Sequence, residues 1–146
     1  MFVTRSEEET IAFGRALARR LPLRAVILLT GKLGAGKTTL AKGIVAGLGA
    51  ASPEEVSSPT FTLIHEYGDP PRVYHIDLYR LDEERELASL GLEEIFEREA
   101  VSLVEWGERF PRQIPAEHVA VLIETAADGA RRIGVTGLPP GPNTAR

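Results

Sequence analysis

The positions of apolar residues along the chain predict an alternation of helices and strands. Between residues 11 and 21, apolar and small side chains recur every three or four positions, as on the buried face of a helix. Ser6 stands three residues before Glu9, which is the pattern of a capping box at a helix start. We therefore expect a helix over about residues 7–21, ended by Pro22.

A second segment joins a strand to a helix through glycines. The apolar run at 25–30 predicts a buried strand, and residues 37–48 read as a helix. Between them lies the glycine-rich stretch Gly31–Thr38. Residues 50–59, rich in Ala, Ser, Pro and Glu, predict a loop.

Two pairs of β-prone runs, each interrupted by a turn signal, predict antiparallel hairpins. The turn signals are Gly68–Pro71 and Asp128–Gly129. His65 and His75 fit the alternation of a strand and show no metal-ligand spacing. The expected strands cover residues 60–67 and 73–77 in the first hairpin, and about 118–124 and 131–136 in the second.

The region between the hairpins combines an acidic stretch with a buried strand. Residues 82–99 are strongly acidic with apolar residues interspersed, which predicts two short helices broken near Gly91. A solvated helix face is the favoured explanation of the acid, and a docking face for a basic partner is the alternative. Residues 100–105 predict a short buried strand that ends in Glu105.

Together these elements predict an α/β fold. We expect one domain over residues 1–138, with a mixed parallel and antiparallel central sheet and helices on both faces. Residues 139–146 contain Pro, Gly and Asn without apolar periodicity, which predicts a flexible C-terminal tail.

The composition narrows the class of protein. The chain of 146 residues is 43% hydrophobic and 26% charged, an ordinary globular balance. Its net charge of −4 provides no overall basic field for holding nucleic acid. The absence of Cys excludes disulfides and thiolate chemistry, and no apolar run is long enough to cross a bilayer. The acidic N-terminus is unlike a signal peptide, so we expect a cytoplasmic protein with no membrane partner.

The stretch Gly31–Thr38 fits the P-loop pattern of Gly, four free positions, then Gly-Lys-Thr. Backbone N–H groups can wrap a triphosphate only where no Cβ intrudes, which is why the loop needs glycines. Lys37 would reach the β- and γ-phosphates, and the Thr38 hydroxyl would ligate Mg²⁺. The expected phosphate-binding residues are Leu33, Gly34, Ala35, Gly36, Lys37, Thr38 and Thr39.

Hydrolysis or transfer of a phosphate also needs an acid near the metal, at the end of a buried strand. Glu105 and Asp77 each end an apolar run in this way. One acid would hold the metal, while the other would orient water or sense the γ-phosphate. A strand-end carboxylate can equally cap a turn or pair with an arginine, and the residues alone leave this choice open.

Two further positions are candidates for coupling to a switch or a partner. Thr60 lies in the hydroxyl-rich segment 57–62, of the kind that can reorder on a γ-phosphate, although an ordinary strand entry explains it as well. Trp106 follows Glu105 directly. A lone Trp most often packs in the core, and beside a metal-binding acid it can also contact a partner.

Several strings of the chain closely resemble one family. The strings 34–39, 58–63, 75–81 and 104–106 occur in the order found in the bacterial TsaE family, small ATPases of tRNA threonylcarbamoyladenosine synthesis. The resemblance extends from the first helix to about residue 136. It is carried most specifically by the Ser-Pro-Thr, Asp-Leu-Tyr-Arg and Glu-Trp strings in combination.

The resemblance implies a P-loop NTPase-like domain that binds ATP or ADP together with Mg²⁺. It implies Thr38 and Glu105 as metal ligands, a need for Asp77 in activity, and a functional role for Trp106. It also implies nucleotide contacts from the start of the first helix and from a late arginine. In this chain the corresponding positions are Ser6, Glu7, Arg131 and Arg132.

The resemblance further implies an accessory Mg²⁺-dependent ATPase that resets a two-protein threonylcarbamoyltransferase complex between rounds of tRNA modification. The modified base is the adenosine next to the anticodon, and tRNA would be reached only through that complex. Two other functions remain as alternatives: a free-standing small-molecule kinase, and a nucleotide-dependent binding switch with negligible turnover. Under the ATPase interpretation the catalytic residues are Lys37, Asp77 and Glu105.

Overall fold

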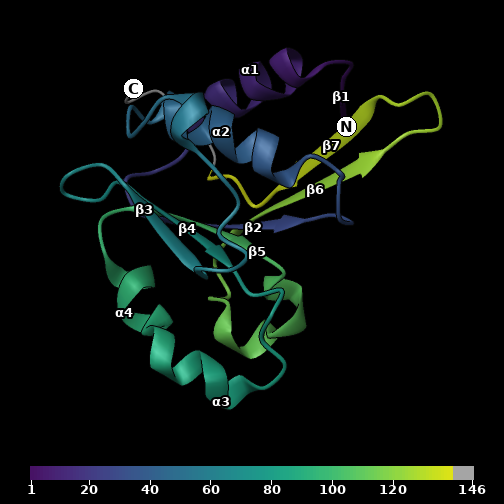
Figure 1. Ribbon diagram of the computed structural model, residues 1–146. Helices are drawn as coiled ribbons and strands as arrows, with labels where there is room; N and C mark the ends of the chain where they lie inside the picture. The colour runs from purple at the N-terminus through teal and green to yellow at the C-terminus, as the bar shows by residue number, and fades with distance from the viewer. Residues whose placement is uncertain (140–146) are drawn as a thin grey trace.

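The computed structural model describes residues 1–139 and contains one continuous seven-stranded sheet with helices packed against it (Figure 1). The strand order across the sheet is β1-β7-β6-β2-β5-β4-β3. The strands are β1 (Phe2–Thr4), β2 (Ala25–Thr30), β3 (Ile64–Tyr67), β4 (Val73–Asp77), β5 (Val101–Glu105), β6 (Val119–Thr125) and β7 (Arg131–Thr136).

The sheet is mixed, as the sequence predicts. Strands β4, β5, β2 and β6 are parallel to one another, and antiparallel pairings add β3 at one edge and β7 with β1 at the other. Because β2, β4 and β5 run the same way, Asp77 lies opposite Glu105, and Glu105 lies opposite Leu29. The two strand-ending acids therefore meet at one end of the sheet.

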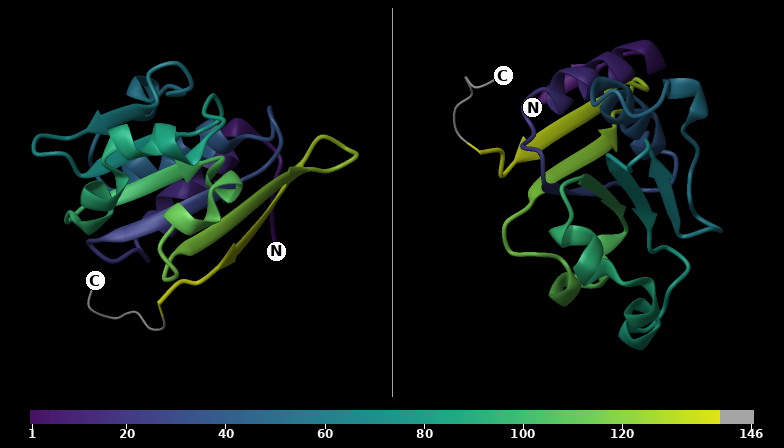
Figure 2. Two further views of the ribbon diagram at one scale, coloured as in Figure 1. Left: turned by 90° about the horizontal axis from the view of Figure 1, so that it is seen from below. Right: turned by 90° about the vertical axis from the view of Figure 1, so that its left-hand side faces the viewer.

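The helices lie on both faces of the sheet, which confirms that prediction (Figure 2). One face is covered by α1 (Glu7–Ala18) and α2 (Lys37–Gly47), and the other by the shorter α3 (Glu84–Leu87) and α4 (Leu92–Glu97). The single-turn 3₁₀ helices are η1 (Pro53–Glu55), η2 (Ala88–Leu90), η3 (Gly107–Arg109) and η4 (Pro111–Gln113).

Alternation along each strand divides the buried side chains into two cores. Ile27 and Leu29 of β2 pack with α1 and α2, whereas Val26 and Leu28 belong to the opposite core. In β5, Leu103 faces the α2 side. Because side chains alternate with a period of two, Glu105 projects to the α2 side as well. The side chains of Asp77 and Glu105 therefore lie on the face of the sheet that α2 covers.

The helices α1 and α2 pack closely because two glycines face each other. A Cβ on Gly14 would lie 2.7 Å from the Leu40 carbonyl oxygen, and a Cβ on Gly43 would collide with the Ile11 carbonyl. Contacts this short are not sustained by real side chains, so both positions require glycine. The close packing fixes α2, which begins at the P-loop, against α1.

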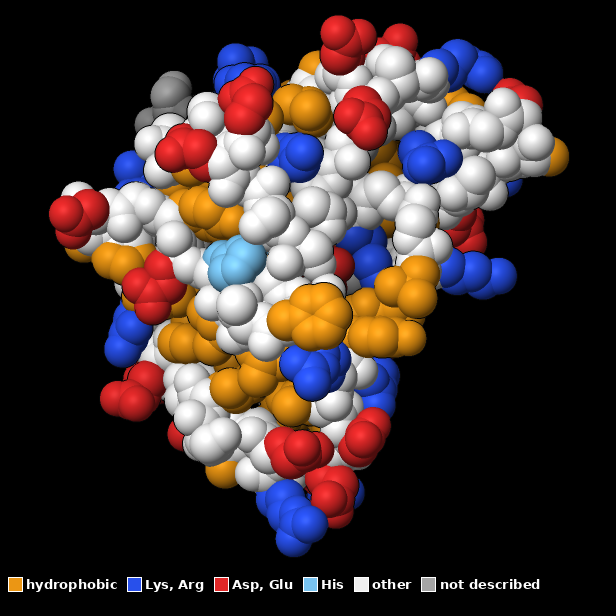
Figure 3. All heavy atoms as spheres, in the orientation of Figure 1, with side chains coloured by type: hydrophobic (Ala, Val, Ile, Leu, Met, Phe, Trp, Pro, Cys, Tyr) orange, Lys and Arg blue, Asp and Glu red, His pale blue; other side chains and the backbone are white. Residues whose placement is uncertain are grey.

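The acidic stretch at 82–99 forms α3, η2 and α4, with a break at Gly91 as predicted. Leu87, Ile95 and Phe96 are buried in the second core, while the acidic side chains are exposed. Figure 3 shows acidic side chains gathered at the lower end of the molecule, where α3 lies in Figure 1. The solvated helix face that the sequence favours is therefore present.

Two expectations about element boundaries were wrong, and one strand was not predicted. The first helix ends at Ala18. Residues 19–21 follow it in a tighter turn, in which each N–H bonds to the carbonyl three residues earlier, and the Leu21 side chain is still buried. Residues 60–63 form turns, because Leu63 has a positive φ of 72° and its N–H bonds back to the Pro59 carbonyl. The strand β1 was not predicted, since a strand of three residues has too short a pattern to detect.

The remaining predicted elements agree with the structure to within one or two residues. Among residues 1–139 no helix is both long enough and apolar enough to cross a membrane. Of the predicted tail, Pro139 has no regular secondary structure, and residues 140–146 lie outside the described residues.

Candidate functional site

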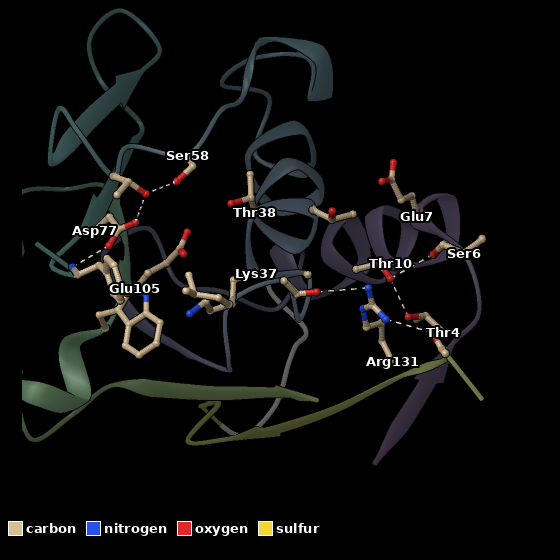
Figure 4. Close-up of a pocket in the computed structure, with 18 of the residues that line it drawn as sticks. Thr4, Ser6, Glu7, Thr10, Lys37, Thr38, Ser58, Asp77, Glu105 and Arg131 are labelled. Carbon is tan, nitrogen blue, oxygen red and sulfur yellow. Dashed lines mark hydrogen bonds between the residues drawn. The ribbon is translucent and has the colours of Figure 1, made fainter. Parts of the chain in front are cut away.

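A cavity of about 450 Å³ opens where β2, β4 and β5 end and α2 begins (Figure 4). Open α/β sheets place ligand sites in this position, beyond the carboxyl ends of the parallel strands. Most of the residues expected at a nucleotide site line it: Ser6, Glu7, Leu33, Gly34, Gly36, Lys37, Thr38, Thr39, Thr60, Asp77, Glu105, Trp106 and Arg131. Two expected residues, Ala35 and Arg132, are not among the lining residues.

The P-loop backbone has the conformation that its glycines allow. Gly34 and Gly36 have φ values of 80° and 108°, which residues with a Cβ rarely adopt. Nothing lies within 4 Å of where a Cβ on Gly34 would be, so the loop is open to the cavity there. Glycine is required at position 31 for a different reason, because a Cβ there would lie 2.6 Å from the Ile123 carbonyl oxygen.

Lys37 is buried, with only 5% of its surface exposed, and its amine is held by two contacts. Nζ donates a hydrogen bond to the Gly31 carbonyl at 2.6 Å and lies 3.9 Å from the centre of the Trp106 ring. Burial lowers the pKa of this amine, while the charges of Glu105, Glu108 and Asp77 act in the opposite direction. The cavity therefore holds a desolvated cation whose partners are a carbonyl and an aromatic face.

Trp106 has a strained backbone, because its φ of 65° lies in the left-handed region that bulky residues avoid. Its ring packs at 5.0 Å from that of Tyr79 and covers the Lys37 amine. Gly107 follows Trp106 directly and is closely surrounded, since a Cβ there would lie 2.7 Å from Leu28 Cδ1. The indole therefore lies at the cavity, over Lys37, and also packs against the edge of the second core.

Glu105 is 3% exposed and is fixed by a buried histidine. The Nε2 atom of His75 lies 2.6 Å from Oε2 of Glu105, and His75 is fully buried. Sequence reasoning treated His75 as an ordinary strand residue. The alternation along 73–77 was the signal that could have placed it on the same face as Asp77.

Asp77 uses both carboxylate oxygens within the protein. Oδ2 accepts a hydrogen bond from the Thr60 hydroxyl at 2.9 Å, and Oδ1 accepts one from the Tyr79 backbone N–H at 2.9 Å. Thr60 Oγ1 also lies 2.7 Å from the Ser58 hydroxyl. Asp77 thus links the end of β4 to the segment 58–60, which the sequence singled out as a candidate switch.

We call Lys37, Thr38, Asp77 and Glu105 the strand-end wall of the cavity. Figure 4 shows the Thr38 hydroxyl directed toward the side of the cavity that carries Asp77 and Glu105. Within residues 1–139 no cluster of three or more acidic or histidine side chains is arranged to hold a metal by itself. A magnesium ion at a nucleotide usually takes only one or two protein ligands, with phosphate oxygens and water completing the set.

The opposite side of the cavity, the edge wall, consists of Thr4, Ser6, Thr10 and Arg131 (Figure 4). The Thr4 and Thr10 hydroxyls lie 2.7 Å apart, and Thr10 also donates to the Ser6 carbonyl. Arg131 donates to the carbonyls of Gly34 and Gly129. Sequence reasoning missed Thr4 and Thr10, because Thr4 reaches the cavity only through the pairing of β1 with β7.

The chain is similar to known proteins over most of its length. A model of the family described as "Threonylcarbamoyl adenosine biosynthesis protein TsaE" matches residues 4–133. The tRNA threonylcarbamoyladenosine biosynthesis protein TsaE of Bacillus subtilis is 42% identical over 136 residues, covering 92% of this chain and 84% of the relative. The protein of that name from Treponema pallidum is 38% identical over 133 residues, covering 91% and 97%.

The fold agrees with a solved structure. The crystal structure of YdiB from Bacillus subtilis is similar with a TM-score of 0.75 and 36% sequence identity, over 94% of this chain and 84% of that one. The matches extend over the P-loop, the strand-ending acids and Arg131 alike. This chain therefore belongs to the TsaE family of tRNA threonylcarbamoyladenosine biosynthesis proteins.

Proposed function

We propose that this chain is a Mg²⁺-dependent ATPase of tRNA threonylcarbamoyladenosine synthesis. Its hydrolysis of ATP to ADP and phosphate would drive the turnover of a two-protein threonylcarbamoyltransferase complex, through which it meets tRNA. The observation that carries the proposal is the convergence of Lys37 and Thr38 with Glu105 and Asp77 around one cavity.

The residues present fit a bound triphosphate. Gly34 offers open backbone, and the start of α2 supplies N–H groups and the positive end of the helix dipole. Lys37 Nζ is held by a single carbonyl oxygen, which a phosphate oxygen can replace with a stronger, charge-assisted hydrogen bond. Burial lowers the pKa of Lys37, and an anion beside the amine would act in the opposite direction by favouring its charged form.

The residues also fit a magnesium ion, for which hydroxyl and carboxylate oxygens are suitable ligands. We assign Thr38 and Glu105 to this role. His75 occupies only Oε2 of Glu105, which leaves Oε1 as the oxygen for the metal. When bound, Mg²⁺ supplies positive charge that neutralises the phosphates.

Of the two acids, Asp77 is then the one that does not hold the metal. Both of its oxygens already accept hydrogen bonds, from Thr60 and from the Tyr79 backbone. We propose that Asp77 holds the 58–60 segment against the site and thereby links the state of the nucleotide to the surface that a partner contacts. Trp106, which lies over Lys37 and against Tyr79, would take part in the same coupling.

We further propose that the edge wall receives the nucleoside part of ATP. Its hydroxyls, together with Glu7 and Arg131, offer neutral and charged hydrogen-bonding groups at the end of the cavity away from Lys37. Family membership favours this ATPase over a small-molecule kinase, because the relatives carry the name of a tRNA-modification protein.

Measurement of phosphate release with ATP and Mg²⁺ tests the proposal. The purified protein is assayed alone, with the transferase complex, and with the complex plus tRNA. We expect slow hydrolysis alone and faster hydrolysis with the complex, and no hydrolysis when EDTA removes Mg²⁺. Brisk hydrolysis that is indifferent to the complex would contradict the accessory role, and phosphate transfer to a small acceptor would support the kinase instead.

A further inference from the structure

His75 is the most deeply buried polar residue beside the site, and it does not line the cavity itself. It is fully buried on β4, and its Nε2 lies 2.6 Å from Oε2 of Glu105. We propose that His75 is a positioning residue that holds the Glu105 carboxylate in the orientation needed for metal binding. This inference rests on the proposed function, because it assigns a task to Glu105 as a metal ligand.

The sheet itself brings the two residues together. Strands β4 and β5 are parallel, with His75 opposite Leu103 and Asp77 opposite Glu105. His75 and Glu105 are therefore diagonal neighbours across two strands, and alternation places both on the face covered by α2. The contact depends on strand register, so it is as rigid as the sheet.

The direction of the hydrogen bond follows from burial. Among the described residues, His75 Nδ1 has no hydrogen-bond partner, although it is buried. An N–H on Nδ1 would be left without an acceptor, whereas an N–H on Nε2 faces a carboxylate at hydrogen-bond distance. His75 Nε2 therefore donates to Glu105.

The unpaired Nδ1 also argues against a purely structural role. The core between the sheet and the helices α1 and α2, into which His75 projects, is built of apolar residues that include Val73 and Leu103. An apolar side chain would fill this position without leaving a buried nitrogen unsatisfied, and buried unsatisfied groups in folded proteins call for an explanation. The explanation offered by the geometry is the carboxylate that the other nitrogen holds.

Holding one oxygen of Glu105 defines where the other points. A glutamate side chain has three rotatable bonds, and without the histidine Glu105 would sample several rotamers in the cavity. Residues that orient a metal ligand in this way commonly change metal affinity or activity 10–100-fold when they are replaced. The same range sets the size of the effect expected here.

The test compares three replacements of His75 by calorimetric titration with ADP, in EDTA and at a series of Mg²⁺ concentrations. His75→Leu removes the donor. His75→Gln keeps an amide N–H near the place of Nε2, whereas the shorter His75→Asn does not reach it. Ser102→Ala is the matched control, because Ser102 is also buried and unpaired but projects to the opposite face of β5.

We expect His75→Leu and His75→Asn to need about tenfold or more Mg²⁺ for tight ADP binding, with affinity in EDTA changed less than about twofold. His75→Gln should recover most of the wild-type Mg²⁺ dependence, and Ser102→Ala should retain all of it. A melting curve for each variant establishes that it is folded. Should His75→Leu fail to fold, the comparison of Gln with Asn decides the matter.

Equal Mg²⁺ dependence of the Gln and Asn variants would overturn the proposal, as would equal losses of affinity with and without Mg²⁺. Failure of the proposed function gives a different result. In that case the wild-type protein itself would bind ADP with no dependence on Mg²⁺, before any change at His75 is considered.

Discussion

The two walls of the cavity are built on different physical principles. Lys37, Asp77 and Glu105 of the strand-end wall are 5%, 2% and 3% exposed, and each charged group has a named partner. In the edge wall, Thr4 and Thr10 are buried to a similar degree but carry no charge, Ser6 is exposed, and the one charged residue, Arg131, is half-buried. Burying a charge costs free energy through desolvation, and partners offset that cost only in part. A wall built of buried charges therefore indicates a functional requirement, and we expect the largest functional effects there.

The largest effect should come from Lys37→Ala, which removes the only buried cation among the described residues of the cavity. We expect hydrolysis to fall by about 100-fold or more, as when a charge-stabilising group is removed from other active sites. Phosphate release measures this. Lys32→Ala, an exposed lysine of the same loop, is the control and should stay close to wild type. A Lys37→Ala protein with near-normal turnover would break the contrast between the walls.

The next effect concerns Glu105→Gln, which keeps the shape of the side chain and removes its charge. The Mg²⁺ concentration for half-maximal hydrolysis should rise about tenfold or more, because a neutral amide is a poor ligand for this ion. The measurement is a Mg²⁺ titration of the rate. Glu93→Gln on α4 changes an exposed acid and should have no effect. Unchanged Mg²⁺ dependence in Glu105→Gln would remove Glu105 from the metal site.

A smaller effect is expected where the strand-end wall meets the candidate switch. Thr60→Val removes the hydroxyl that donates to Asp77, and we expect about a fivefold loss of hydrolysis stimulated by the transferase complex, equivalent to about 1 kcal/mol. Thr62→Val, an exposed neighbour, serves as the control.

Asp77→Asn completes a double-mutant cycle with Thr60→Val. If the hydrogen bond is the cause, the two changes together should be little worse than Asp77→Asn alone. Additive losses in the stimulated rate would show that Thr60 and Asp77 act separately.

On the edge wall, neighbouring arginines provide a direct comparison. Arg131 lines the cavity and bonds to the Gly34 carbonyl, whereas Arg132 is exposed and is not among the lining residues. Arg131→Ala should weaken ATP binding about three- to tenfold, and Arg132→Ala should leave it unchanged. Calorimetric titration measures both. Equal losses in the two variants would mean that general positive charge, not a defined wall, attracts the nucleotide.

The smallest effect is on stability and tests the burial of Lys37. Its pKa is lowered in the folded chain from an ordinary 10.5, so the unfolded chain holds more protons between the lowered value and 10.5. The contribution of Lys37 to stability therefore rises with pH across that window. Lys37→Met should melt above wild type at pH 7, with the difference shrinking toward pH 10. A constant difference, or one matched by Lys32→Met, would contradict this account.

The same contrast explains how much the sequence could predict. The strand-end wall follows from local patterns: a P-loop, and acids directly after two apolar runs. The meeting of the two acids could also be expected, because parallel strands bring their carboxyl ends to the same edge of the sheet. Even so, alternation alone did not separate Asp77 from Glu105. That distinction needed the hydrogen bonds to Thr60 and to His75, which join residues 17 and 30 positions apart.

The edge wall could not be derived in this way. Thr4 reaches the cavity because it pairs with Arg131, across almost the whole length of the chain. A strand of three residues carries no usable periodicity, and threonine hydroxyls are common on any surface. Only the resemblance to a family pointed to this side, and it pointed to Arg131 and Arg132 equally. The structure separates them, because adjacent residues of a strand face opposite sides of the sheet.

The most direct test of the account is a crystal structure with Mg²⁺ and a non-hydrolysable ATP analogue. We predict phosphates against Lys37, the metal at about 2.1 Å from oxygens of Thr38 and Glu105, and the nucleoside against the edge wall. Asp77 should keep its contact with Thr60. A metal bound to Asp77 in place of Glu105, or a nucleotide in the reverse orientation, would contradict the central claim.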